Sequence, residues 1–106
     1  MSIQEKIKQQ IADNNIIIYM KGNKELPMCG FSARALNMLK ACGCEFEVVN
    51  VLEDEAIREG IKVYSNWPTI PQLYVNGEFI GGSDIIAEMY EAGELQELVM
   101  SSQPSA

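Results

Sequence analysis

The sequence contains no histidine among its 106 residues. Imidazole is the commonest metal ligand and the usual acid–base group near neutral pH, so a metal site or proton transfer here must use other side chains. Basic residues are also scarce, with eight Lys and Arg against fifteen Asp and Glu. The formal net charge of −7 argues against nucleic acid or an anionic membrane as the main partner. A bound anion would need a local group of cations.

Cysteine is limited to three residues, an odd number, and the N-terminus shows no secretory signal. We therefore expect free thiols in a reducing compartment, the cytoplasm or an organelle matrix from which a targeting segment was removed. The longest apolar run, residues 16–20, is far shorter than the roughly 20 residues that span a bilayer. The length fits one domain, expected over residues 1–100, followed by a disordered polar tail over 101–106.

Local patterns predict alternating helices and strands. Periodic apolar residues with caps and glycine stops predict helices, and short β-branched apolar runs predict strands. The expected helices cover residues 3–13, 30–42, 54–64 and 94–100, with a further one capped by Ser83-Asp84 and closed by Gly93; the expected strands cover 16–20, 46–51, 72–75 and 78–80. The first two strands and their helix form a parallel β-α-β unit, and Asn76-Gly77 predicts a hairpin between the last two. The fold class is therefore α/β, a mixed four-stranded sheet with helices on both faces in the thioredoxin-like arrangement.

Cys29 is the candidate reactive residue, because it lies where an exposed loop ends and a helix begins. Unpaired backbone N–H groups and the positive end of the helix dipole favour the thiolate, which attacks disulfides and binds soft metals. Ser32 stands where a C-x-x-C pair would have its second cysteine. A disulfide within the motif is therefore excluded, and the thiolate needs a partner from elsewhere. The alternative for a lone cysteine is simple burial in the core.

The other two cysteines, Cys42 and Cys44, follow the far end of the same helix. Thirteen residues of helix place Cys42 roughly 20 Å from Cys29, so the two cannot share a metal site within one chain. We expect Cys42 to be a core residue and Cys44 a partly exposed thiol without an assigned task. The apolar positions of this helix that we expect to face the core are Phe31, Ala35, Leu36, Leu39 and Cys42.

From residue 7 to residue 99 the sequence resembles the monothiol glutaredoxins of the Cys-Gly-Phe-Ser class. The resemblance rests on several motifs in a fixed order, namely residues 19–22 (YMKG), 26–32 (LPMCGFS), 64–75 (YSNWPTIPQLYV) and 81–85 (GGSDI). Many bacterial members have cysteine where this chain has Ser83. The resemblance implies a cis peptide bond before Pro71, a glutathione site and a bridging iron-sulfur cluster.

Glutathione carries two carboxylates, an ammonium group and a thiol, so its site needs separated cations, an anion and a peptide edge. The resemblance implies that Lys21, Arg58 and Lys62 bind the glycine carboxylate and that Thr69, Ile70 and Pro71 offer the peptide edge. It also implies that Gly82, Ser83 and Asp84 bind the γ-glutamyl end at the start of a helix. Without the resemblance, the cations would be interpreted as solvated surface charges, and Ser83 and Asp84 as an ordinary helix cap.

Two functions fit the resemblance. In the first, a 2Fe-2S cluster takes four ligands, which a homodimer would supply as two Cys29 thiolates and two glutathione thiols, and the cluster passes to apoproteins or a BolA-like partner. In the second, Cys29 removes glutathione from mixed disulfides as a redox enzyme. The long loop over 22–28 and the Trp67-Pro68 element accompany weak oxidoreductase activity in the resembling family and favour the first. A third hypothesis, a module that only binds proteins, would make Cys29 dispensable.

Overall fold

The computed structural model describes residues 2–102 and has the expected mixed four-stranded sheet, in the order β2-β1-β3-β4. The strands are β1 (Ile16–Met20), β2 (Glu47–Asn50), β3 (Gln72–Val75) and β4 (Glu78–Gly81). The helices are α1 (Ile3–Asp13), α2 (Gly30–Ala41), α3 (Glu55–Ser65), α4 (Ser83–Glu91), α5 (Glu94–Ser101) and a short 3-10 helix, η1 (Val51–Glu53), that the sequence patterns did not predict. None of the described helices is long and apolar enough to cross a membrane.

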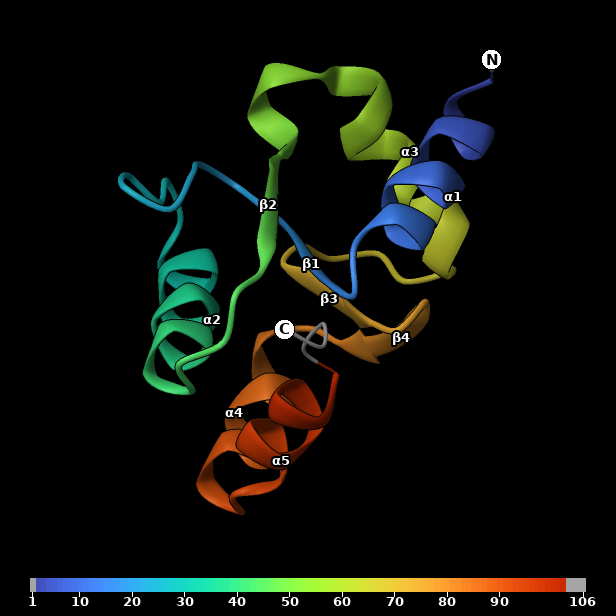
Figure 1. Ribbon diagram of the computed structural model, residues 1–106. Coiled ribbons are helices and arrows are strands. Elements are labelled where there is room, and N and C mark those ends of the chain that lie inside the picture. Colours follow the sequence, from blue (N-terminus) through green and yellow to red (C-terminus); the bar gives the residue numbers. More distant parts are fainter. Residues whose placement is uncertain (1, 103–106) are drawn as a thin grey trace.

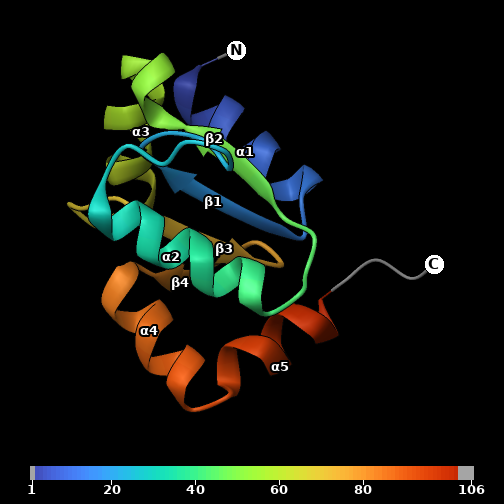
Figure 2. The ribbon, with the colours of Figure 1, turned by 90° about the vertical axis from the view of Figure 1, so that its left-hand side faces the viewer.

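Strand β1 lies inside the sheet, parallel to β2 and antiparallel to β3, and all five of its residues are buried. Its side chains alternate between the two faces, as they must in a strand. Ile18 and Met20 join a core with α2, α4 and α5, whereas Ile17 and Tyr19 join a second core with α1 and α3. Figures 1 and 2 show these two groups of helices on opposite faces of the sheet. The prediction of a central strand covered on both sides is confirmed.

Three connections meet at one end of the sheet. Strand β1 runs into the loop 21–28, which leads to Cys29 and α2. Strand β3 is antiparallel to β1 and pairs its first residue, Gln72, with Tyr19 near the end of β1. Gly81, at the end of β4, lies opposite Leu73. The loop after β1, the segment before β3 and the start of α4 are therefore brought together by the strand directions alone.

Several predicted local signals are confirmed. Ser2 and Glu5 make a complete capping box on α1, and the side chain of Asp54 accepts hydrogen bonds from the first turn of α3. Asn76 and Gly77 have φ values of 52° and 83°, as a two-residue hairpin turn requires. The polar and glycine residues at these positions thus satisfy backbone groups that the elements leave open.

Three expectations are wrong. The N-cap of α4 is Gly82 rather than Ser83-Asp84, and within residues 2–102 no side chain makes a capping hydrogen bond to that helix. Phe31 is 62% exposed, because it lies in the first turn of α2 and lines a surface cavity instead of the core. The tail does not begin at residue 101: Ser101 ends α5, and Ser102 is buried and accepts hydrogen bonds from the side-chain amides of Asn15 and Asn76. The rest of that expected tail, residues 103–106, lies outside the described residues.

Candidate functional site

A cavity of about 410 Å³ opens at the end of the sheet where the three connections meet. The ten residues predicted from the sequence to form the site all line it: Lys21, Cys29, Arg58, Lys62, Thr69, Ile70, Pro71, Gly82, Ser83 and Asp84. The remaining lining residues, which sequence reasoning had not assigned to the site, are the apolar Phe31, Trp67, Pro68 and Ile85. Five separate segments of the chain thus contribute to one concave surface, which is the usual form of a small-molecule site.

Cys29 is the N-cap residue of α2, and its side chain makes no capping hydrogen bond. The backbone N–H of Ser32 is the largest influence on the thiol and lowers its pKa below the ordinary value; the N–H of Phe31, the Lys21 charge and the Ser32 hydroxyl act in the same direction, whereas partial burial opposes them. The helix start therefore stabilises the thiolate, as the sequence position predicted.

Ser32 is fully buried and links α2 to the loop 21–28. Its hydroxyl oxygen accepts a hydrogen bond of 3.1 Å from the backbone N–H of Lys21, the first residue after β1. The sequence carried a signal for this burial that was missed, since Ser32 precedes Ala35, Leu36 and Leu39 by three, four and seven residues on one helical face. Ser32, which stands in place of the second cysteine of a C-x-x-C pair, therefore also fixes the start of the loop 21–28.

The loop 21–28 is held by several backbone and side-chain hydrogen bonds. Gly22 forms a bridge with Pro27, and the Met28 N–H donates to the Lys21 carbonyl at 2.9 Å. The side chain of Asn23 accepts from two N–H groups within the loop, and the Asn50 side chain accepts from the Gly22 N–H at 2.9 Å. Cys29 is thus presented by an ordered loop rather than by an unrestrained one.

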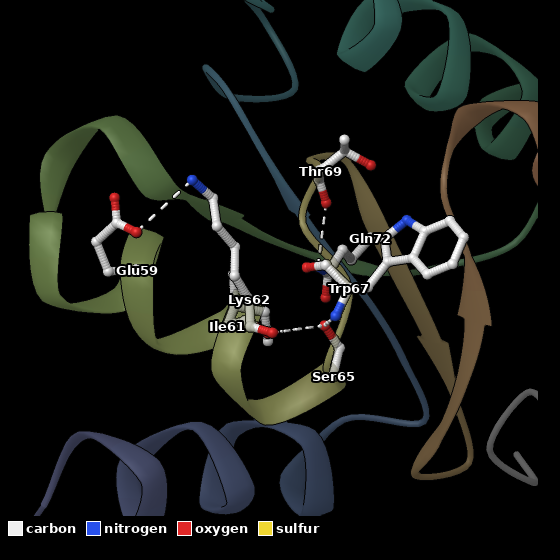
Figure 3. Close-up of polar contacts among 7 residues, drawn as sticks. All are labelled: Glu59, Ile61, Lys62, Ser65, Trp67, Thr69 and Gln72. Carbon is white, nitrogen blue, oxygen red and sulfur yellow. Dashed lines mark hydrogen bonds and ion pairs between the residues drawn. The ribbon is translucent and has the colours of Figure 1, made fainter.

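Three cations and one carboxylate line the cavity, although the chain as a whole has a net charge of −7. Lys62 Nζ lies 3.7 Å from Oε2 of Glu59, which precedes it by three residues on α3 (Figure 3). Within residues 2–102 the other ion pair joins Lys6 and Asp54, so Lys21 and Arg58 have no carboxylate partner there. The cavity is therefore a local cationic site to which α4 adds one carboxylate, that of Asp84, as an anionic ligand with an ammonium group would require.

The segment from Trp67 to Pro71 forms one wall of the cavity. The Ile70–Pro71 peptide bond is cis, as the resemblance implied. The indole of Trp67 packs against Phe79 of β4, with ring centroids 6.0 Å apart. Gly82 approaches this wall closely, since a Cβ added there would lie 3.3 Å from the Pro71 carbonyl oxygen and 3.6 Å from Trp67 Nε1. A glycine at this position lets α4 begin against the wall.

The start of α4 offers hydrogen-bonding groups that the described part of the chain leaves unused. No side chain caps the helix, so its first N–H groups lack the partner that a cap would provide. The hydroxyl of Ser83, a residue 8% exposed, has no hydrogen-bond partner among the described residues. An unpaired helix N-terminus suits a carboxylate, because both the N–H groups and the helix dipole favour negative charge.

Comparison with known proteins places this geometry in a family. A family model described as glutaredoxin matches residues 16–80, more than half of the chain. The chain belongs to the glutaredoxin family. It is 56% identical over 100 residues to glutaredoxin 4 of Buchnera aphidicola, covering 94% of this chain and 93% of the relative. It is 54% identical to a monothiol glutaredoxin of Synechocystis, covering 89% and 88% of the two chains. The solution structure of reduced apo GrxS14 from poplar matches with a TM-score of 0.81 at 45% identity, over 94% and 92% of the two chains.

This glutaredoxin is monothiol in its motif, since Cys29-Gly30-Phe31-Ser32 supplies a single cysteine to the cavity. Cys42 is buried at 3% exposure and belongs to the core, and Cys44 is half-buried with its thiol near the Leu39 carbonyl oxygen. Burial raises the pKa of both thiols. The predictions of a core cysteine and a partly exposed one are confirmed, and neither residue lines the cavity.

The opposite pKa shifts predict selective alkylation of Cys29. At a pH below the ordinary pKa of a cysteine thiol, Cys29 has a larger thiolate fraction than an ordinary cysteine, because its pKa is lowered. Cys42 and Cys44 have a smaller thiolate fraction at that pH, because their pKa values are raised. Limiting iodoacetamide at pH 7 should therefore modify Cys29 first, and raising the pH toward 10 should reduce the selectivity. Peptide mass mapping of each cysteine over time checks this. Equal labelling of Cys44 and Cys29 at pH 7 would contradict it.

Proposed function

We propose that this glutaredoxin binds glutathione in the cavity and, as a homodimer, holds a 2Fe-2S cluster between two protomers for delivery to iron-sulfur apoproteins. The observation that carries the proposal is the placement of a stabilised Cys29 thiolate beside three cations, a peptide edge and an uncapped helix N-terminus in one cavity. The cytoplasm fits this role, because all three thiols are free. A BolA-like protein is the proposed alternative partner to the second copy.

Each part of glutathione has a matching group. Lys21 and Arg58, which have no carboxylate partner in the described chain, would bind the glycine carboxylate, with Lys62 beside them. Ile70, before the cis Pro71, would pair its backbone with the cysteine of the peptide in the manner of an added strand. The start of α4 would bind the γ-glutamyl carboxylate, and the Asp84 side chain its ammonium group. The glutathione thiol would then lie on the side of the cavity that Cys29 lines.

The thiols present fit a shared cluster. A 2Fe-2S cluster takes four ligands, usually thiolates, and serves here as the cargo of the proposed carrier. Residues 2–102 hold no group of three or more Cys, Asp or Glu side chains that could bind a metal ion, and Cys29 is the one cysteine that lines the cavity. One protomer with one glutathione would supply two thiolates, so two protomers would supply four.

The second candidate function is glutathione-dependent reduction of mixed disulfides, which the lowered pKa of Cys29 favours. The Cys29 thiolate would attack the glutathione sulfur of a protein–glutathione disulfide, release the protein thiolate and become glutathionylated. A second glutathione would then attack that disulfide, releasing oxidised glutathione and restoring Cys29. This sequence needs no second cysteine and uses the same cavity.

Anaerobic reconstitution with iron, sulfide and glutathione tests the two functions against each other. The carrier function predicts a visible chromophore on a dimer that fails to form when glutathione is omitted, read by absorption, circular dichroism and mass in solution. A colourless monomer that rapidly reduces a glutathione mixed disulfide would contradict the carrier function and establish the enzyme.

Replacing Arg58 by alanine should raise the glutathione concentration needed for half-maximal chromophore about tenfold, since a charge-assisted contact contributes on the order of 1–3 kcal/mol. Lys8→Ala is the matched control, because it removes one positive charge from an exposed position on α1 outside the cavity. Reconstitution over a glutathione titration measures both variants. An unchanged requirement in the Arg58 variant would show that the glycine carboxylate binds elsewhere.

A further inference from the structure

Gln72, the first residue of β3, is fully buried beneath the wall of the cavity without lining it. A buried primary amide is destabilising unless its donors and acceptor are all paired. The hydrogen-bond partners of the Gln72 side chain therefore identify the backbone groups that it holds in place. Its Nε2 donates to the carbonyl oxygen of Trp67 at 3.2 Å and to that of Thr69 at 3.1 Å (Figure 3). Both acceptors belong to the segment that forms the cavity wall.

The orientation of this amide is set by Tyr74, two residues further along β3 and on the same face of the strand. The Tyr74 hydroxyl donates to Gln72 Oε1 at 3.2 Å. Burial raises the pKa of Tyr74 to about 12, so the hydroxyl keeps its proton and remains a donor at neutral pH. With the oxygen directed at a donor, the NH2 group must face the two carbonyls, and each of its two protons has an acceptor.

The bond to the Thr69 carbonyl also fixes the next N–H group. The cis peptide bond of this region joins Ile70 to Pro71, so the Thr69–Ile70 peptide is trans. In a planar trans peptide the C=O and N–H groups point in opposite directions. Because the Thr69 carbonyl is directed at buried Gln72, the Ile70 N–H is directed away from it, and Ile70 lines the cavity.

We propose that Gln72 is a positioning residue for glutathione, which holds the Trp67 and Thr69 carbonyls so that the Ile70 N–H is presented to the peptide ligand. The inference rests on the proposed function, since the Ile70 N–H has this task only if glutathione binds. The Gln72 side chain never touches the ligand and acts through the wall. Its loss should therefore weaken glutathione binding without removing any group that contacts glutathione.

Gln72→Met tests the proposal, because methionine has similar length but neither donates to the two carbonyls nor accepts from Tyr74. Gln10→Met is the matched control: Gln10 Oε1 accepts from the Tyr19 hydroxyl at 2.7 Å, which is a second tyrosine–glutamine pair of this protein, and Gln10 does not line the cavity. Both variants are expected to lose some thermal stability. Only Gln72→Met should lose glutathione affinity, by about tenfold, the equivalent of about 1.4 kcal/mol.

Two spectroscopic signals report on the wall itself. Trp67 is the single tryptophan of the chain, so its fluorescence during a glutathione titration of the apoprotein follows this segment alone. The backbone amide resonance of Ile70 should shift and gain protection from hydrogen exchange when glutathione binds the unsubstituted protein and Gln10→Met, but much less in Gln72→Met. A change in overall stability alone would not produce this selective loss.

The outcomes separate the two proposals. Equal glutathione affinity and an equal Ile70 shift in Gln72→Met and the unsubstituted protein would overturn the positioning role and leave the proposed function standing. No response to glutathione in the unsubstituted protein would overturn the proposed function, and the positioning role with it. If Gln72→Met does not fold, Tyr74→Phe replaces it: this variant keeps both carbonyl bonds available but frees the amide to rotate, and it should show the same losses at a smaller size. Unchanged affinity in that variant would overturn the inference.

Discussion

Replacing Cys29 by serine is expected to abolish the glutathione-dependent chromophore while leaving the fold intact. Cys29 is the one cysteine that lines the cavity, and a serine hydroxyl stays protonated at neutral pH and is a poor ligand for iron. The side chain of Cys29 makes no capping bond, whereas serine is a favourable N-cap residue. The free energy of unfolding should therefore change by no more than about 0.5 kcal/mol, or rise slightly.

Cys44→Ala is the control for this experiment, because it removes a half-buried thiol that lies outside the cavity. It should keep the full chromophore on reconstitution. Visible absorption and circular dichroism after reconstitution, with thermal unfolding of the apoproteins, measure both variants. A chromophore that survived in the Cys29 variant would refute the ligand assignment, and one lost in the Cys44 variant would transfer the assignment to that residue.

The same replacement separates the third hypothesis, a module that only binds proteins, from the other two. Both glutathione-dependent functions need the Cys29 thiolate, since one uses it as a ligand and the other as a nucleophile. A binding module would use exposed apolar side chains such as Phe31, which lines the cavity and is 62% exposed, and Met28, which precedes Cys29 and is 60% exposed; it would keep its activity without the thiol. Loss of the chromophore and of mixed-disulfide reduction in the Cys29 variant would therefore exclude a module that only binds proteins.

Much of the fold could be predicted because its local signals agree with its tertiary structure. The β-branched apolar run over 16–20 suits a strand covered on both faces, which is what β1 is, and Asn76-Gly77 fits the positive φ values of its turn. Phe31 could not be placed by the same reasoning. Helical periodicity gives the direction of a side chain around the axis, but whether that direction is covered depends on what lies beside the first turn.

The cavity itself was predicted by resemblance rather than by local pattern. Its lining comes from five segments distant in sequence, and only the strand order brings them to one end of the sheet. The supporting polar residues are harder still to predict. Gln72 lies in a strand buried on both faces, where alternation gives no contrast, so the sequence does not distinguish a glutamine that holds a wall from one that faces solvent.

Gly22→Ala should disrupt the loop that presents Cys29. Gly22 has φ of +95°, which non-glycine residues rarely adopt, and this conformation alone costs alanine on the order of 1–3 kcal/mol. An added Cβ would also lie 2.5 Å from the Met28 backbone nitrogen and 2.8 Å from the Pro27 Cα. These are backbone atoms, which cannot rotate aside as the end of a side chain can, so the loop must move.

The expected result is a fall in the unfolding midpoint of more than about 5 °C, together with a large loss of chromophore. The loss of chromophore follows because the Gly22–Pro27 bridge and the Met28 hydrogen bond to Lys21 set the position of Cys29 relative to the cations. Thermal unfolding by circular dichroism and hydrogen exchange of the Met28 amide measure the two effects. Gly30→Ala is the stability control, because a Cβ there meets no atom within 4 Å and the residue begins α2.

The two glycines distinguish a requirement of the loop from a general sensitivity to glycine substitution. If Gly22→Ala kept the unfolding midpoint of Gly30→Ala, the loop would have a second conformation of equal free energy, and its hydrogen bonds would not fix Cys29. If the midpoint fell but the chromophore at low temperature were retained, the loop would stabilise the fold without positioning the thiol. A fall in the unfolding midpoint together with loss of the chromophore is the expected result. It would show that the backbone conformation of the loop 21–28 sets the position of Cys29 on which cluster binding depends.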